Sequence, residues 1–216
     1  MTATPEESAV RRLPGEHVLG NPGAPVTVVE YGDYECPYCA AAAPVLRRLV
    51  EESDGGIRLV FRHFPLAERH PYALTAALAA EAAGAQGGFW PMHDLLFVRQ
   101  ERLDDAALRA YAEELGLDGD RVVGQAAQPF GDKIEADFAA GLAAGVAGTP
   151  TVLVDGRRFS GRMELGALRR AVSGGNGGLE PGPRRQRRWP LGLRRAQREA
   201  LAEDAEQDDT GDRCHH

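Results

Sequence analysis

Two cysteines close together are the residues of this sequence with the clearest chemistry. The motif Cys36-Pro37-Tyr38-Cys39 places them two residues apart, and the third cysteine, Cys214, lies near the end of the chain. A Cys-x-x-Cys pair can exchange disulfides, because one thiolate attacks a disulfide sulfur and the second thiol then resolves the mixed disulfide. Three cysteines are too few for the disulfide framework of a stapled mini-domain. The pair therefore indicates either redox chemistry or half of a metal site.

A zinc site is the main alternative for this pair. Structural zinc takes four ligands, so a Cys-x-x-Cys needs two more, commonly cysteines or histidines. His63, His70 and His93 show no ligand-like spacing, and Cys214 lies far along the chain. We therefore favour redox chemistry and expect no metal.

The cysteines stand where a predicted strand passes into a predicted helix. The β-branched run 25–31 predicts a buried strand, and Pro37 fits the first turn of a helix, where its missing N–H costs nothing. The free N–H groups and the dipole of a helix N-terminus stabilise a thiolate. We therefore expect Cys36 to be the nucleophile, with an exposed sulfur. Cys39, one turn further in, is expected to be the more buried resolving cysteine, within reach of a Cys36–Cys39 disulfide.

The rest of the pattern predicts the elements that position this junction. A second strand is expected at 57–64, so that a βαβ unit makes the first two strands parallel. Apolar residues at helical spacing predict several helices between 72 and 146. Two further strands, 151–154 and 157–160, are expected on either side of Asp155-Gly156, a strong hairpin signal, and a helix at 164–172 closes the pattern.

Charge and hydropathy argue against several classes of protein. The net charge of −7 is unlike that of a generic nucleic-acid binder, which needs a basic surface. No run approaches the roughly 18 apolar residues of a membrane-spanning helix. Residues 1–12 hold no apolar stretch of the kind that a secretory signal needs. We therefore expect a cytoplasmic monomer that binds neither nucleic acid nor membrane.

A change of composition after residue 173 predicts a domain boundary. We expect an N-terminal extension at 1–15, one folded domain at 16–173 and a flexible charged tail at 174–216. The tail begins with glycines and continues with an Arg-rich block and then an acidic block, a pattern typical of disorder or of a marginal helix. The alternative is that the Arg-rich block binds an acidic partner or RNA.

Taken together, the motifs resemble a known family. Val26–Ala40, with the cysteine pair at its strand–helix junction, is similar to the active site of the thioredoxin superfamily. The βαβ unit, a helical insertion at about 66–146 and a ββα unit starting at Gly148-Thr149-Pro150 resemble its DsbA-like branch. This resemblance implies an α/β, thioredoxin-like fold with the insertion between its two halves. Glutaredoxins share Cys-Pro-Tyr-Cys, but their chain is shorter and lacks the insertion.

The resemblance also implies roles for residues beside the cysteines. Pro150 matches the family's cis-proline, which faces the cysteine pair, and Thr149 would offer its backbone to an extended substrate. Pro37 and Tyr38 would contact the substrate as well. An ordinary trans proline at the start of a strand is the alternative for Pro150.

Glu30 matches the family's buried acid beneath the second cysteine. In an apolar strand the pKa of this carboxyl should be raised, which suits it to relay a proton to Cys39. The alternative is a carboxylate at the end of a strand that points into solvent.

The expected function is thiol–disulfide exchange without a cofactor. The resemblance implies an oxidoreductase that acts on protein thiols and disulfides, with the thioredoxin or glutathione system as its redox partner. DsbA-type oxidases have histidine where this sequence has Tyr38, so in a reducing cytoplasm we expect reduction or isomerisation. Two alternatives are a glutathione-linked disulfide reductase or isomerase for a small molecule, and a non-catalytic, redox-sensing binding module.

Overall fold

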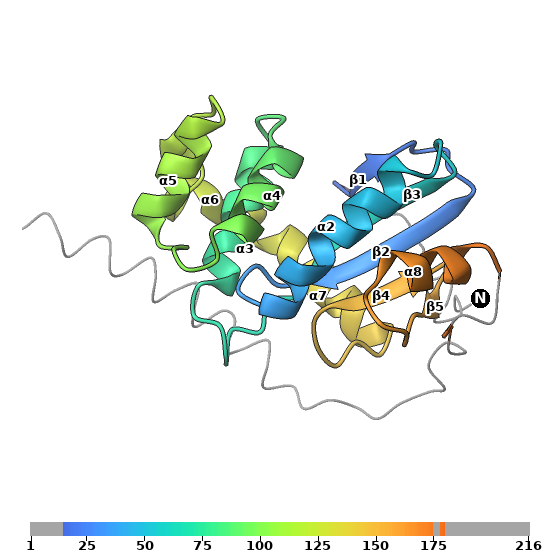
Figure 1. Cartoon of the computed structure of the whole chain (residues 1–216). Coiled ribbons are helices and arrows are strands. Elements are labelled where there is room, and N and C mark those ends of the chain that lie inside the picture. Colours follow the sequence, from blue (N-terminus) through green and yellow to red (C-terminus); the bar gives the residue numbers. More distant parts are fainter. Residues whose placement is uncertain (1–14, 175–177, 180–216) are drawn as a thin grey trace, which may run out of the picture.

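A mixed five-stranded sheet forms the centre of the molecule. The computed structural model describes residues 15–174 and 178–179, and its strands are ordered β1-β3-β2-β4-β5 (Figure 1). β2 and β3 are parallel, and the other neighbouring strands are antiparallel. The strands are β1 (His17–Gly20), β2 (Val26–Gly32), β3 (Ile57–His63), β4 (Thr151–Val154) and β5 (Arg157–Arg158). This sheet and its helices confirm the predicted α/β fold class.

Helices cover both faces of the sheet (Figure 1). On one face Leu46 and Leu168 bury their side chains in a core shared with the central strands. On the other face Phe138 stacks on Phe64, with their ring centroids 4.4 Å apart. Because β2 is covered on both faces, it consists mainly of apolar residues instead of alternating ones. The helices are α2 (Pro37–Glu51) and α8 (Leu165–Val172) on the first face and α7 (Gly131–Ala143) on the second.

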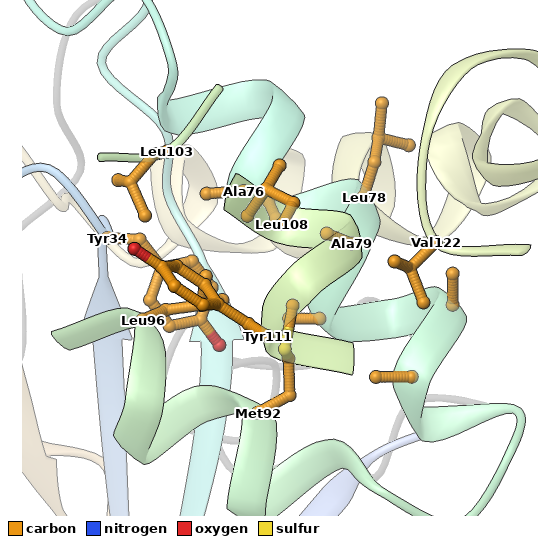
Figure 2. Packing of buried hydrophobic residues seen from close by; sticks show 14 of the residues in the cluster. Tyr34, Ala76, Leu78, Ala79, Met92, Leu96, Leu103, Leu108, Tyr111 and Val122 are labelled. Carbon is orange, nitrogen blue, oxygen red and sulfur yellow. The ribbon is translucent and has the colours of Figure 1, made fainter. Parts of the chain in front are cut away.

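The helical insertion between β3 and α7 forms a lobe beside the sheet (Figure 1). Its helix α3 is rich in alanine and buried on nearly every side, so the neighbouring helices approach it closely. Figure 2 shows Met92, Leu96 and Leu108 in this core, together with Tyr34, which comes from the loop after β2. The elements of the lobe are α3 (Ala73–Gly84), α4 (Phe89–Val98), α5 (Asp105–Glu114), η1 (Gly119–Arg121), α6 (Gly124–Ala127) and η2 (Gln128–Phe130).

The differences from the predicted elements lie at the edges of the sheet. β1 was not predicted, because its four residues, three half-buried and one exposed, carry too short a pattern to indicate a strand. β5 has two residues where a strand at 157–160 was expected, and Phe159 instead forms an isolated bridge with Leu179. The backbone N–H of Ser160 donates to the Gly178 carbonyl at 2.8 Å, so Gly178 and Leu179 lie at this edge. The predicted N-terminal extension, the rest of the tail and Cys214 lie outside the described residues.

Candidate active site

Cys36 occupies the N-cap position of α2. Its backbone is extended, Pro37 follows as the first helical residue, and no side chain caps the helix. The backbone N–H groups of Cys39 and Ala40 donate to the Cys36 carbonyl at 3.0 and 3.2 Å, which closes the first turn. Of the first helical residues, Tyr38 and Cys39 also direct backbone N–H groups toward the Cys36 side chain, as the strand–helix junction predicts.

The surroundings of Cys36 favour its thiolate. Its pKa is lowered to about 5, mainly by a hydrogen bond from the Cys39 thiol, against the opposing effect of burial. A Thr149 hydrogen bond and the backbone N–H groups of Cys39 and Tyr38 lower it further. Cys36 is only 4% exposed, so the prediction of an exposed sulfur is wrong for this conformation. The reason is that the Thr149 carbonyl oxygen lies 3.4 Å from Sγ and covers it.

Cys39 has the opposite character. It is fully buried, and burial raises its pKa well above the ordinary value, as do the hydrogen bond to Cys36 and the charge of Glu30. Both cysteines are free thiols in this structure. At neutral pH the pair therefore combines one thiolate with one thiol that keeps its proton, and the predicted disulfide between them stays a prediction.

Glu30 lies on β2 and is completely buried. Burial raises its pKa to about 8, and the charge of Cys36 contributes to the same shift. Among the residues that the structure describes, neither oxygen of this carboxyl has a hydrogen-bond partner. The structure thus favours the buried acid over the solvent-exposed carboxylate. A carboxyl with a pKa near 8 is partly ionised at physiological pH, and in that form it can accept a proton from a buried thiol.

Replacing Glu30 by glutamine should remove a pH-dependent cost of folding. The folded pKa of about 8 exceeds the ordinary value of 4.5, so the contribution of protonated Glu30 is complete below pH 4.5 and lost as the pH rises through 8. Glutamine cannot ionise and escapes this loss. We therefore expect the free energy of unfolding of Glu30→Gln, relative to that of the wild type, to be about 3–5 kcal/mol higher at alkaline pH than in acid. Urea unfolding at a series of pH values measures this difference. The exposed Glu101→Gln serves as control, and a pH-independent difference for Glu30→Gln would contradict the assignment.

The loop before β4 faces the cysteine pair. The Thr149–Pro150 peptide bond is cis, which rules out the trans alternative for Pro150 in this structure. The Thr151 hydroxyl donates to the Gly148 carbonyl at 2.7 Å and fixes the loop. The loop thus places a backbone carbonyl against the nucleophile, and the role of Thr149 and Pro150 toward a substrate stays a prediction.

Pro37 and Tyr38 lie on the surface at the start of α2. Tyr38 is 74% exposed, and within residues 15–174 and 178–179 the other exposed large hydrophobic residues are Tyr72 and Val98. Tyr72 lies next to the cysteine turn, since its backbone N–H donates to Glu35 at 2.5 Å. The exposure of Pro37 and Tyr38 leaves both side chains accessible to a substrate. Their contact with a substrate stays a prediction.

The turn before Cys36 is buried, which differs from the surface turn that its polar residues suggest. Asp33 is 2% exposed because its carboxylate accepts hydrogen bonds from the Leu66 N–H and from His70 Nδ1, both at 2.8 Å. Its other oxygen accepts from the Glu35 N–H at 2.8 Å. Tyr34 is buried in the core of the insertion. Polar residues are therefore found here because the insertion supplies their partners.

One residue near the cysteines carries no motif at all. Gln100 follows α4 in the insertion, and its side-chain amide donates to the carbonyls of Tyr34 and Cys36 at 2.6 and 3.0 Å. No sequence signal connects a glutamine in a helix–helix loop with a cysteine 64 residues earlier. The contact exists only because the insertion folds back on the start of α2.

A buried group of charged residues lies where β3, α3 and α7 meet. His63, Glu81 and Asp137 offer ligand atoms within 4.8 Å of one another, an arrangement compatible with a metal ion. Lys133 Nζ, however, lies 2.5 Å from Asp137 and 3.6 Å from Glu81, so an ammonium already supplies the positive charge there. His17 also bonds Glu81, at 2.9 Å. We assign this group a structural role.

Comparisons with known proteins agree with this geometry. The family described as Thioredoxin matches residues 12–173. A thioredoxin-like oxidoreductase from Silicibacter pomeroyi DSS-3 is 32% identical, with a TM-score of 0.69 over 77% of this chain and 95% of that chain. BdbD from Bacillus subtilis is 23% identical and shares the fold, with a TM-score of 0.64 over 74% of this chain and 92% of that chain. The chain therefore belongs to the thioredoxin family that this model describes.

A curated relative is a much longer protein. The Na⁺/H⁺ antiporter NhaA 1 from Salinispora arenicola (strain CNS-205) is 49% identical over 173 residues, which are 80% of this chain and 26% of that protein. This chain thus spans about a quarter of the length of the curated relatives it matches. Within residues 15–174 and 178–179, no helix combines the length and the apolar character needed to cross a membrane.

Proposed function

We propose that this chain is a thiol–disulfide oxidoreductase that acts on protein substrates. The observation that carries the proposal is the opposite character of two neighbouring thiols, with Cys36 favoured as thiolate and Cys39 as thiol. The pair lies at the start of α2, beside the cis Thr149–Pro150 bond. The family, together with the thioredoxin-like oxidoreductase that shares the fold, supports the coarser assignment, an oxidoreductase.

The proposed exchange proceeds in two steps. The Cys36 thiolate attacks one sulfur of a substrate disulfide, a mixed disulfide forms, and the other substrate sulfur leaves as a thiolate that takes a proton. Cys39 then passes its proton to Glu30 and attacks Cys36 Sγ, which releases the second substrate thiol. The substrate gains two electrons, and the Cys36–Cys39 pair becomes a disulfide. In the reverse direction the same steps oxidise a substrate dithiol.

The direction of electron flow depends on how strongly the reduced pair is stabilised. The absence of histidine at Tyr38 does not deprive Cys36 of stabilisation, because the Cys39 thiol, Thr149 and backbone N–H groups provide it. A stabilised thiolate favours the reduced form, and therefore makes the disulfide a stronger oxidant. We propose that the thioredoxin or glutathione system sets the redox state of the pair in the cytoplasm.

Turnover with a protein disulfide tests the proposal. With insulin as substrate and dithiothreitol as reductant, we expect catalytic amounts of the protein to accelerate reduction of the insulin disulfides. The rate should saturate with insulin. With glutathione as reductant, saturation by glutathione instead of insulin would favour the small-molecule alternative. The absence of any acceleration would contradict an exchange enzyme.

A second candidate is a redox-sensing module that belongs to a transporter. The observation in its favour is that the relative from Salinispora arenicola, 49% identical over 173 residues, is named a Na⁺/H⁺ antiporter. Such a module would change its thiol state once per oxidation and would not accelerate exchange. The insulin assay separates the two candidates, because only an enzyme processes many disulfides per molecule.

A further inference from the structure

Gln100 connects the helical insertion to the backbone of the nucleophilic cysteine. It lies in the turn after α4, and its side-chain nitrogen donates to the Tyr34 carbonyl at 2.6 Å and to the Cys36 carbonyl at 3.0 Å. These two carbonyls lie on either side of Glu35, in the turn that leads into α2. One amide group therefore holds both ends of this short segment.

The Cys36 carbonyl is the point where this contact reaches the reactive sulfur. The same oxygen accepts the backbone N–H groups of Cys39 and Ala40, which form the first turn of α2. The Cys39 N–H is also among the groups that stabilise the Cys36 thiolate. A carbonyl oxygen that accepts hydrogen bonds from two different elements has the orientation of its peptide plane fixed by them. Gln100 thereby fixes the peptide from which the N–H groups around Sγ are oriented.

The turn that contains Glu35 is also bound to the part of the insertion that precedes α3. Asp33 accepts hydrogen bonds from the Leu66 N–H and from His70, while Glu35 accepts one from the Tyr72 N–H. Tyr34 is buried among the leucines of the insertion (Figure 2). These contacts fix the turn, and Gln100 extends the attachment to the first residue of the active-site motif.

We propose that Gln100 is a positioning residue for thiol–disulfide exchange, acting through its paired hydrogen bonds to the Tyr34 and Cys36 carbonyls. The inference rests on the proposed function. Gln100 touches neither sulfur, so its effect is exerted through the backbone of Cys36. The insertion thus helps to keep the nucleophile reactive, because one of its residues positions the backbone of Cys36.

The test is the pH profile of Cys36 alkylation by iodoacetamide in the reduced protein, followed by mass spectrometry. Gln100→Leu keeps the size of the side chain and removes both donors. We expect its profile to move up by about one pH unit, with alkylation at pH 5 falling several-fold and alkylation at pH 9 nearly unchanged. Gln100→Glu, which replaces the donor with an acceptor, should move the profile further and decides the matter if Gln100→Leu does not fold.

The matched control is Gln86→Leu. Gln86 binds the backbone within the insertion in the same manner, donating to the Ala82 and Asp118 carbonyls, but it has no contact with the cysteine turn. We expect this variant to lose stability while its alkylation profile matches the wild type. Unchanged profiles for both Gln100 variants, or an equal shift for Gln86→Leu, would overturn the proposal. Alkylation needs no turnover, so failure of the insulin assay with a shifted profile would count against the proposed function alone.

Discussion

Replacing Cys36 by serine should reduce disulfide exchange to the uncatalysed rate. The serine hydroxyl does not ionise near neutral pH, so the thiolate that attacks the substrate is lost. Cys39 cannot substitute for it, because it is fully buried and its pKa is raised. The rate of insulin reduction, measured beside the wild type, gives this result directly.

Cys39→Ser is the matched variant, and its expected result differs in kind. Cys36 still attacks, but no second thiol releases the mixed disulfide, so covalent adducts with the substrate accumulate. Because the Cys39 thiol is the largest cause of the lowered Cys36 pKa, the attack should be fastest at higher pH than in the wild type. Full turnover in Cys36→Ser, or the absence of adducts on Cys36 in Cys39→Ser, would contradict the assigned roles.

Replacing Glu81 by leucine should produce the largest loss of stability. Its carboxylate accepts hydrogen bonds from His63 at 2.8 Å and from His17 at 2.9 Å, and Lys133 lies 3.6 Å away. Without it, the His63 and His17 rings lose this acceptor, and Lys133 keeps only its pair with Asp137. Breaking a buried ion pair on one side costs about 3–5 kcal/mol, and we expect the free energy of unfolding to fall by that amount. Urea unfolding at pH 7 measures it.

The pH dependence of stability provides a second measurement on Glu81. Burial opposes ionisation, but the hydrogen bonds from His17 and His63 outweigh it, so the pKa of Glu81 is lowered from 4.5. A lowered folded pKa contributes stability above the unfolded value, and this contribution is lost as the pH falls below it. The loss in free energy of unfolding caused by Glu81→Leu, relative to the wild type, should therefore be smallest in acid. Glu114→Gln, which breaks an exposed pair with Arg99, is the control, and an equally small effect for Glu81→Leu would contradict the buried network.

The sequence predicted the features that depend on neighbouring residues. The cysteine pair, the strand before it and Pro37 at the start of a helix are local patterns, and the structure has each of them. The hairpin at Asp155-Gly156 is equally local, and Asp155 has the positive φ that such a turn requires. Each of these features is determined by the conformational preferences of a few neighbouring residues.

The missed features depend on contacts between distant parts of the chain. Asp33 and Tyr34 look like a surface turn until the insertion covers them, and Gln100 acquires its role only when α4 reaches the start of α2. Glu81 lies in an alanine-rich helix where only the fold shows that histidines surround it. The cytoplasmic location and the monomeric state stay predictions from the sequence.

The reduction potential of the Cys36–Cys39 pair tests the proposed chemistry most directly. It is measured by equilibration with glutathione buffers, followed by thiol trapping. The Cys36 pKa of about 5 lies between the values of about 7 in thioredoxin and about 3.5 in DsbA. We therefore expect a potential between about −270 mV, that of thioredoxin, and about −120 mV, that of DsbA. A potential at or below that of thioredoxin, or no disulfide between the two cysteines, would contradict a stabilised thiolate at Cys36.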